Sequence, residues 1–72
     1  KLNGKAKKEY FPNGKLKSVQ AVNNAFQPHG IFTEYWENEK VKTKGRFKQG
    51  KQIGTWRYYN KKGKLIEKKR IK

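Results

Sequence analysis

The chain has no cysteine and no aspartate, and it contains one serine, Ser18, and one histidine, His29. The missing thiols exclude disulfides and thiolate metal sites, although they leave the cellular compartment open. The carboxylates are five glutamates: Glu9, Glu34, Glu37, Glu39 and Glu67. A nucleophile, a base and an orienting group cannot be assembled convincingly from this inventory. We therefore expect no enzyme activity and no catalytic, cofactor-binding or metal site.

Three local patterns resemble chemical sites but are better explained by turns. Glu37 and Glu39 lie next to Lys40 and are interpreted as solvated turn residues instead of an acid/base pair. His29 has no second ligand of suitable type nearby, so a structural role in a turn is favoured over metal binding. The stretch GRFKQGKQ fits Gly-x4-Gly-Lys, but Gln52 stands where a phosphate-binding loop needs Ser or Thr, and no helix is expected to follow.

Negative charge and long apolar runs are both scarce. No run of apolar residues approaches the roughly 20 that a membrane-spanning helix needs. Lys and Arg number 20 against 5 Glu, which gives a formal net charge of +15. This excess favours an anionic partner, namely an acidic protein, an anionic membrane surface or nucleic acid. Lys far outnumbers Arg, whereas specific phosphate or base recognition favours Arg, so specific nucleic-acid recognition is disfavoured.

The aromatic content argues against disorder. Hydrophobic residues make up only 32% of the chain, and with this charge they would suggest a disordered segment. Ten aromatic residues are nevertheless spread along the 72 positions. We expect a thin folded domain, one at most, whose core is built mainly from rings.

One pattern occurs three times. From the second copy onward a shift of 24 residues aligns the sequence with itself, and the first copy fits at a shift of 25, which pairs Tyr10 with Tyr35. The predicted units, 4–29, 30–53 and 54–72, form a single domain without linkers. The residues that define the repeat are Tyr10, Gly14, Leu16, Gly30, Phe32, Tyr35, Val41, Gly54, Trp56, Tyr59, Gly63 and Leu65.

The period within a unit is two. In KVKTKGRFK, residues 40–48, cationic side chains alternate with smaller or apolar ones, as a half-buried strand requires. The predicted strands are 4–11, 15–23, 30–36, 40–48, 54–60 and 64–71. Short turns join them, so we predict an all-β antiparallel meander of about six strands, without helices.

The sequence also predicts the types of turn that join the strands. Pro12-Asn13-Gly14 predicts a three-residue hairpin loop, a type I turn closed by a glycine bulge. Glu39 replaces that glycine in the second copy, at a cost on the order of 1 kcal/mol, so we expect a looser or reshaped turn there. The connection around Gly50 predicts a tight turn, and its counterpart before Pro28 predicts a longer loop.

The aromatic residues allow two interpretations. In the structural one, Phe32 stacks on Trp56, and a tyrosine faces an aliphatic residue across each hairpin. These facing pairs are Tyr10 with Leu16, Tyr35 with Val41 and Tyr59 with Leu65. In the functional one, Trp36 and Tyr58, which lack an aromatic match in the third and second copy respectively, are surface anchors beside Lys40 or Lys42.

The cations also allow two interpretations. Lys40, Lys42, Lys44, Arg46 and Lys48 are predicted to form one stripe, which Lys64, Lys68, Arg70 and Lys72 continue. Such a stripe is most simply a solvated face that protects a thin sheet from edge pairing. As a functional surface it would attract anionic lipid by about 1 kcal/mol per residue. The candidate partner or lipid surface is therefore Trp36, Tyr58, Lys40, Lys42, Lys44, Arg46 and Lys48.

These residues resemble a known family. GRFKQGKQIGTW, residues 45–56, is similar to the core of a MORN repeat, and HGIF carries the His-Gly element of many copies. The phrase Gly-x-Trp-x-x-Tyr-x-x-x-x-Gly-Lys-Leu from Gly54 to Leu65 resembles the MORN repeat variant of bacterial proteins labelled YwqK-family antitoxins. Ala25, where the later copy has Gly50, and Glu39 depart from the pattern.

The resemblance implies a curled single-layer sheet of stacked hairpins that serves as a scaffold or interaction surface. We accordingly predict a non-enzymatic β-repeat module that binds a protein partner in an antitoxin-like manner, with self-association through its outer strands. The alternatives are peripheral binding to anionic membrane lipid through the Lys-rich face and, more weakly, nonspecific nucleic-acid binding. No cofactor and no small-molecule substrate are expected.

The first residue is Lys1 instead of Met, so we expect a piece of a longer chain or a processed product. A soluble protein of the bacterial cytoplasm is slightly favoured, and export stays open as an alternative.

Overall fold

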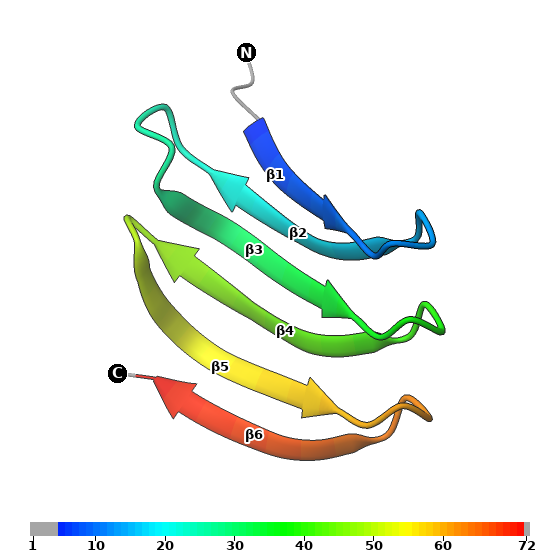
Figure 1. The fold of residues 1–72 in the computed structure, drawn as a ribbon. Coiled ribbons are helices and arrows are strands. Elements are labelled where there is room, and N and C mark those ends of the chain that lie inside the picture. The colour runs from blue at the N-terminus through cyan, green and yellow to red at the C-terminus, as the bar shows by residue number, and fades with distance from the viewer. Residues whose placement is uncertain (1–4, 72) are drawn as a thin grey trace.

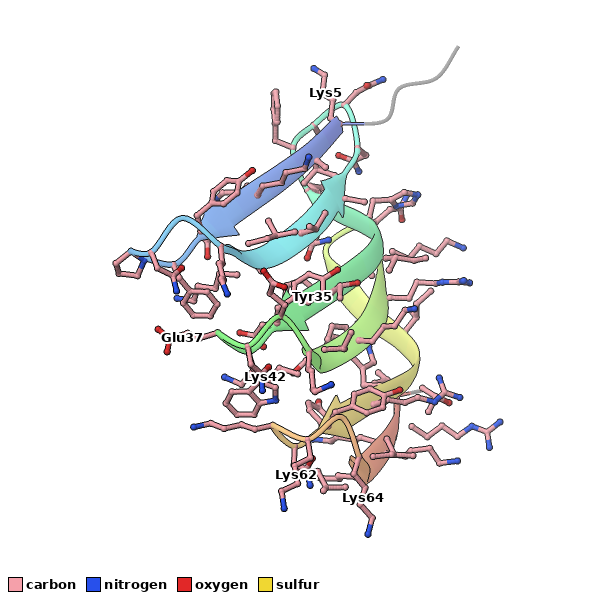
Figure 2. The ribbon with its side chains drawn as sticks, turned by 90° about the vertical axis from the view of Figure 1, so that its right-hand side faces the viewer. Lys5, Tyr35, Glu37, Lys42, Lys62 and Lys64 are labelled. Atoms are coloured by element: carbon pink, nitrogen blue, oxygen red, sulfur yellow. The ribbon has the colours of Figure 1, made fainter. Side chains whose placement is uncertain are left out.

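The computed structural model describes residues 5–71 and shows one antiparallel sheet (Figure 1). In this range the strands are β1 (Lys5–Tyr10), β2 (Leu16–Val22), β3 (Pro28–Tyr35), β4 (Val41–Lys48), β5 (Lys51–Tyr59) and β6 (Leu65–Ile71). Each strand pairs with the next in chain order, and no helix covers either face of the described sheet. The predicted all-β meander is confirmed. The strands bow along their length, and side chains project from both faces of the single layer (Figures 1 and 2).

Strands β3 and β5 begin earlier than predicted. Gly30 and Gly54, which were expected to begin them, lie inside them. Both glycines have a positive φ, 109° and 74°, and the pairing with the preceding strand shifts register around them. Glycine accepts this backbone conformation without a Cβ penalty. The two residues are therefore repeat-related bulges that bend the sheet, and the predicted strand boundaries at these positions are wrong.

The hairpin turns share one geometry. In the β1–β2 turn, the N–H of Gly14 donates to the carbonyl of Phe11 at 2.8 Å, and the N–H of Phe11 donates to the carbonyl of Lys15 at 2.8 Å. The β3–β4 and β5–β6 turns repeat both bonds. This is the predicted three-residue loop, with the left-handed residue at its end.

The expected reshaping of the turn at Glu39 is wrong. Glu39 adopts φ 73°, close to the 88° of Gly14, and its turn closes with the same hydrogen bonds. The side chain of Asn38 supports this geometry, since its Oδ1 accepts the N–H of Lys40 at 3.0 Å. Asn-mediated turns of this kind hold the backbone locally, so the strain at Glu39 is tolerated without a change of shape.

The β2–β3 connection is shorter than predicted. Pro28 already belongs to β3, and residues 24–26 form another three-residue turn, in which Phe26 has φ 60°. Its counterpart between β4 and β5 is a two-residue turn at Gln49 and Gly50, both with positive φ. The extra residue in the first turn explains why the first repeat fits at a shift of 25 instead of 24.

The core is small and aromatic. Phe32 and Trp56 stack at 5.8 Å between ring centroids, as predicted, and Phe47 packs edge-on against both rings at 6.1 and 5.1 Å. Trp56 is 3% exposed and is the one buried hydrophobic residue within residues 5–71. Its ring lies on Gly45, where a Cβ would come within 2.1 Å of it. We call the side of the sheet that carries Phe32, Phe47 and Trp56 the aromatic face.

The predicted tyrosine pairs are also present. Tyr10, Tyr35 and Tyr59 lie opposite Leu16, Val41 and Leu65, respectively, at the turn end of each hairpin.

Candidate partner-binding groove

Cations cover the face of the sheet opposite the aromatic face. Lys44 pairs in register with Arg57, and Arg57 pairs with Lys68, so three cations form a row across β4, β5 and β6. Residues paired across antiparallel strands share a face, as do residues two apart on one strand. Arg46, Lys48 and Arg70 therefore extend the row into what we call the cationic face: Lys44, Arg46, Lys48, Arg57, Lys68 and Arg70.

Little of this charge is compensated. Over residues 5–71 one ion pair forms, between Lys15 and Glu39 at 3.6 Å, and both side chains are exposed. It links the tips of the first two hairpins and does not involve the cationic face.

The predicted single stripe is wrong in part. Lys40 and Lys64 precede β4 and β6 and lie in the turns, whereas Lys48 lies two residues after Arg46 on β4 and stays on the cationic face, as predicted. Lys72 lies outside the described residues. Lys42 is a bulged residue, because the pairing of β3 with β4 passes from Tyr35–Val41 directly to Glu34–Thr43. The bulge breaks the alternation on which the predicted stripe depends.

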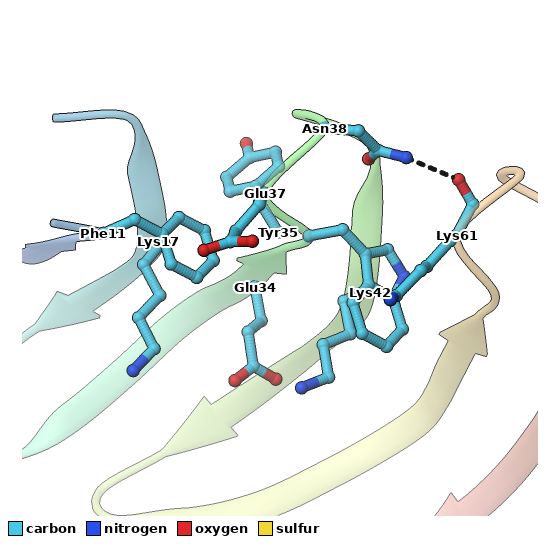
Figure 3. Close-up of a pocket in the computed structure, with 9 residues that line it drawn as sticks. Phe11, Lys17, Glu34, Tyr35, Glu37, Asn38, Lys42 and Lys61 are labelled. Carbon is cyan, nitrogen blue, oxygen red and sulfur yellow. Dashed lines mark hydrogen bonds between the residues drawn. The ribbon is translucent and has the colours of Figure 1, made fainter. Parts of the chain in front are cut away.

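The bulge directs Lys42 toward Trp36 and into a groove. The Lys42 ammonium lies 4.7 Å from the centroid of the Trp36 ring, as a cation–π contact. The groove has a volume of about 440 Å³ and lies along the turn ends of the hairpins (Figure 3). Its main lining residues are Phe11, Lys17, Glu34, Trp36, Lys42 and Lys61.

An aromatic–lysine pair occurs twice along this groove. Lys17 lies 6.0 Å from the Phe11 ring in the first repeat, as Lys42 lies 4.7 Å from the Trp36 ring in the second. Lys17 is also bulged, because the register of β1 with β2 shifts at the equivalent place. The repeated backbone therefore produces the pair in both copies. In each, a bulge directs a strand lysine toward an aromatic ring at the turn end of the hairpin.

The third repeat has Asn60 and Ile66 at the equivalent positions, so it lacks the pair. Lys61 extends back from that repeat instead and lies 5.5 Å from the Trp36 ring. Two side chains of the second hairpin tie it to the third: Trp36 Nε1 donates to the carbonyl of Tyr59 at 3.2 Å, and Asn38 Nδ2 donates to the carbonyl of Lys61 at 2.8 Å. The Trp36 ring is therefore held in place, half-buried, with lysines around it.

Of the two proposed aromatic anchors, one lines the groove and the other does not. Trp36 lies beside Lys42 in the groove, although it is half-buried and not exposed as a surface anchor would be. Tyr58 is half-buried on β5, opposite Thr43 on one side and Glu67 on the other, and it does not line the groove.

Four groove residues were not singled out from the sequence: Phe11, Lys17, Glu34 and Lys61. The signal for two of them was available, because the shift of 25 that aligns the first copies also pairs Phe11 with Trp36 and Lys17 with Lys42. The position of Lys61 depends on the stacking of hairpins and has no sequence signal of this kind.

The remaining candidate residue, His29, has a structural role, as predicted. Its Nδ1 accepts a hydrogen bond from the backbone N–H of Gln49 at 3.1 Å, which ties the β4–β5 turn to the start of β3. Within residues 5–71, no three side chains of His, Cys, Asp or Glu come together as a metal site would require. The same part of the chain contains no helix with the length and apolarity to cross a membrane.

The repeat identifies the family. The family model for the MORN repeat variant matches residues 4–24, 28–49 and 52–72, which is one match for each hairpin and most of the chain. The chain belongs to the MORN repeat variant family. No significant match was found among curated proteins or among solved structures. MORN repeats are in general non-enzymatic modules that interact with proteins and membranes.

Proposed function

We propose that this MORN protein is a non-enzymatic module that binds a partner protein, and that an acidic part of the partner occupies the groove. The observation that carries the proposal is the repeated aromatic–lysine pair. In each pair the aromatic ring supplies contact area, and the lysine supplies charge complementarity to an acidic partner. Phe11 with Lys17 and Trp36 with Lys42 provide this combination twice, at equivalent positions of neighbouring repeats.

The shape and charge of the groove favour a protein over a lipid surface. Trp36 is half-buried and held by its bond to Tyr59, so it is not free to insert into a bilayer interface. Glu34 and Glu37 also line the groove and would repel a dense layer of anionic headgroups. A protein segment can place its own carboxylates at the lysines and keep them away from these glutamates.

The net charge of +15 adds a long-range contribution. Uncompensated charge of one sign accelerates the encounter with a partner of the opposite sign and makes it sensitive to salt. The cationic face would thereby attract an acidic partner, and the groove would select among those that arrive.

Charge reversal in the groove tests the proposal. The variant Lys17→Glu/Lys42→Glu removes both repeated pairs, and Lys62→Glu/Lys64→Glu makes the same change in net charge in the exposed β5–β6 turn (Figure 2). Each protein is used to capture partners from nuclease-treated native lysate, and captured proteins are then tested in purified form. We expect a partner retained by the parent chain and the turn variant and lost from the groove variant. Equal retention by both variants would contradict the use of the groove.

A second candidate function is binding to an anionic membrane through the cationic face. It is favoured by the in-register row of Lys44, Arg57 and Lys68, since clustered cations near an anionic bilayer each contribute about 1 kcal/mol. Flotation with anionic and neutral vesicles, at low and high salt, tests it with the variant Arg57→Glu. Retention that is independent of lipid charge and of Arg57 would exclude this candidate, and a parallel titration with single-stranded DNA covers nonspecific nucleic-acid binding.

A more specific version of this proposal is that the partner is a toxin, which the chain neutralises. This form is supported by the resemblance of Gly54 to Leu65 to the variant repeats of proteins labelled as antitoxins. Co-expression of the chain with a candidate toxin should restore the growth that the toxin alone arrests, and Lys17→Glu/Lys42→Glu should abolish the rescue. Growth arrest in the presence of the intact chain would argue against the antitoxin role and leave protein binding in general unaffected.

A further inference from the structure

We infer that the groove binds an acidic segment of its partner in the polyproline II conformation, with a carboxylate at every third residue. The inference rests on the proposed function and specifies the conformation and the sequence pattern of the bound segment.

The spacing of the two lysines carries the inference. Lys17 lies on β2 and Lys42 on β4, at equivalent positions of neighbouring repeats, so they are separated by two strand spacings. Neighbouring strands lie about 4.8 Å apart, which places the two positions about 9.6 Å apart across the sheet. A ligand that crosses the strands must present its anionic groups at this interval.

Polyproline II matches this interval. It has three residues per turn and rises about 3.1 Å per residue, so residues i and i+3 lie on one side about 9.3 Å apart. An extended strand repeats its side at about 6.7 Å. An α-helix returns to the same side near this interval only after seven residues, at about 10.5 Å, and its diameter of about 10–12 Å is large for a groove of this size.

The groove supplies both kinds of contact that such a segment needs. Polyproline II segments dock on aromatic-lined surfaces, where their rigid rings pack without a large loss of conformational entropy. Phe11 and Trp36 provide the aromatic rings of such a surface, one repeat apart. Lys17 and Lys42 lie next to these aromatic rings and would receive the two carboxylates.

Glu34 limits the number of carboxylates that the groove can accept. Figure 3 shows its carboxylate extending between Lys17 and Lys42, and within residues 5–71 it takes part in no ion pair. A further carboxylate on the groove side would be repelled by Glu34, and the two residues between the bound carboxylates of a polyproline II segment point away from the groove. The preferred pattern is therefore acidic-x-x-acidic, in which x does not face the groove.

Two peptides of identical composition test the spacing. One is acetylated and amidated (Glu-Pro-Pro)₃, with carboxylates three residues apart. The other is acetylated and amidated Pro-Glu-Pro-Glu-Pro-Glu-Pro-Pro-Pro, in which they are two residues apart. Affinities for the intact chain are measured by calorimetry, and the binding site is mapped by amide chemical shifts. We expect the first peptide to bind about tenfold more tightly, because it makes two charge-assisted contacts where the second makes one.

Protein variants locate the effect. Lys42→Gln should weaken binding of (Glu-Pro-Pro)₃ about tenfold and remove the preference between the peptides, whereas Lys62→Gln, with the same loss of charge in the β5–β6 turn, should preserve it. A third peptide, (Gln-Pro-Pro)₃, should bind weakly to the unmodified chain, and this control does not depend on how any variant folds.

Equal affinity for the two acidic peptides would overturn the inference, because it would mean that charge alone is recognised. Chemical shifts confined to the cationic face would overturn it as well. These results are independent of the capture experiment, so an acidic partner in another conformation would leave the proposed function standing.

Discussion

The outer strands β1 and β6 are equivalent by the repeat to strands in the middle of the sheet, but their side chains are of a different kind. On the aromatic face, the same row holds Phe32, Gly45 and Trp56 in β3, β4 and β5, and it ends in Lys7 on β1 and Lys69 on β6. Every residue of β1 is exposed, and so is every residue of β6 before Ile71. The aromatic core therefore belongs to the middle strands, whereas the outer ones are held mainly by backbone pairing.

This difference shows that the repeat determines the backbone and that only some copies supply packing. In a repeat protein each unit contacts its neighbours alone, so stability is a sum of local terms that need not be equal. The strands with few buried apolar contacts open most easily. Mutations at equivalent positions should consequently differ widely in effect, and the following predictions test that expectation from the largest effect to the smallest.

Trp56→Ala should have the largest effect. Truncating a buried aromatic residue costs about 3–5 kcal/mol, and a chain of this size has a total stability on the order of 4–10 kcal/mol. Trp56 also contacts both other rings of the core, at 5.8 and 5.1 Å. We expect a largely unfolded protein by circular dichroism and denaturant titration.

Two control variants accompany that measurement. Trp56→Phe keeps a ring, and it removes an indole N–H that is buried without an acceptor in the described part of the chain, so its cost should be below about 1.5 kcal/mol. Ile66→Ala on β6, where the side chain is 62% exposed, should change the stability by less than about 0.5 kcal/mol. Similar losses for Trp56→Ala and Ile66→Ala would mean that the core is not confined to the middle strands.

Gly45→Ala should follow in size. The added Cβ would meet the Trp56 ring at 2.1 Å, a distance that the ring can relieve only by moving off its contacts with Phe32 and Phe47. Overpacking of this kind costs about 1–3 kcal/mol. Gly63→Ala, whose Cβ would have no contact closer than 3.6 Å, serves as a comparison for strain without a clash. Retention of full stability by Gly45→Ala would show that Trp56 can shift freely.

Much of this architecture could be predicted from the sequence, because the responsible interactions are local and repeated. Alternation identified the strands, the Pro12-Asn13-Gly14 turn identified the hairpins, and the match of Phe32 with Trp56 identified the ring stack. The family followed from the same features.

The errors arose where a residue departs from the repeat without changing the backbone. Glu39 adopts the conformation of a glycine because the rest of its turn is intact, and Gly30 bends a strand that it was expected to begin. The groove was missed for a different reason. A bulge takes Lys42 out of the alternation, and Lys61 reaches Trp36 only because the hairpins stack side by side.

Glu39→Gly should be modestly stabilising. Glu39 has φ 73°, which costs a non-glycine residue on the order of 1 kcal/mol, and its exposed ion pair with Lys15 at 3.6 Å is worth little. Part of the gain is offset because glycine is more flexible in the unfolded chain. We expect a rise of about 0.5 kcal/mol in the free energy of unfolding, while Glu39→Ala should give none. A loss of stability in Glu39→Gly would show that the contact with Lys15 matters more than the backbone strain.

His29→Ala should have a small effect that stays local to the β4–β5 turn. His29 Nδ1 accepts the N–H of Gln49 at an exposed position, so its loss should cost about 0.5 kcal/mol. The change should appear locally, as faster hydrogen exchange of the Gln49 amide in the β4–β5 turn, while the amides of β1 and β6 exchange as before. His29→Asn, which retains a side-chain acceptor, should restore part of the protection. Faster exchange throughout β4 and β5 would mean that this turn contributes to the stability of the aromatic core and is more than a connection between its strands.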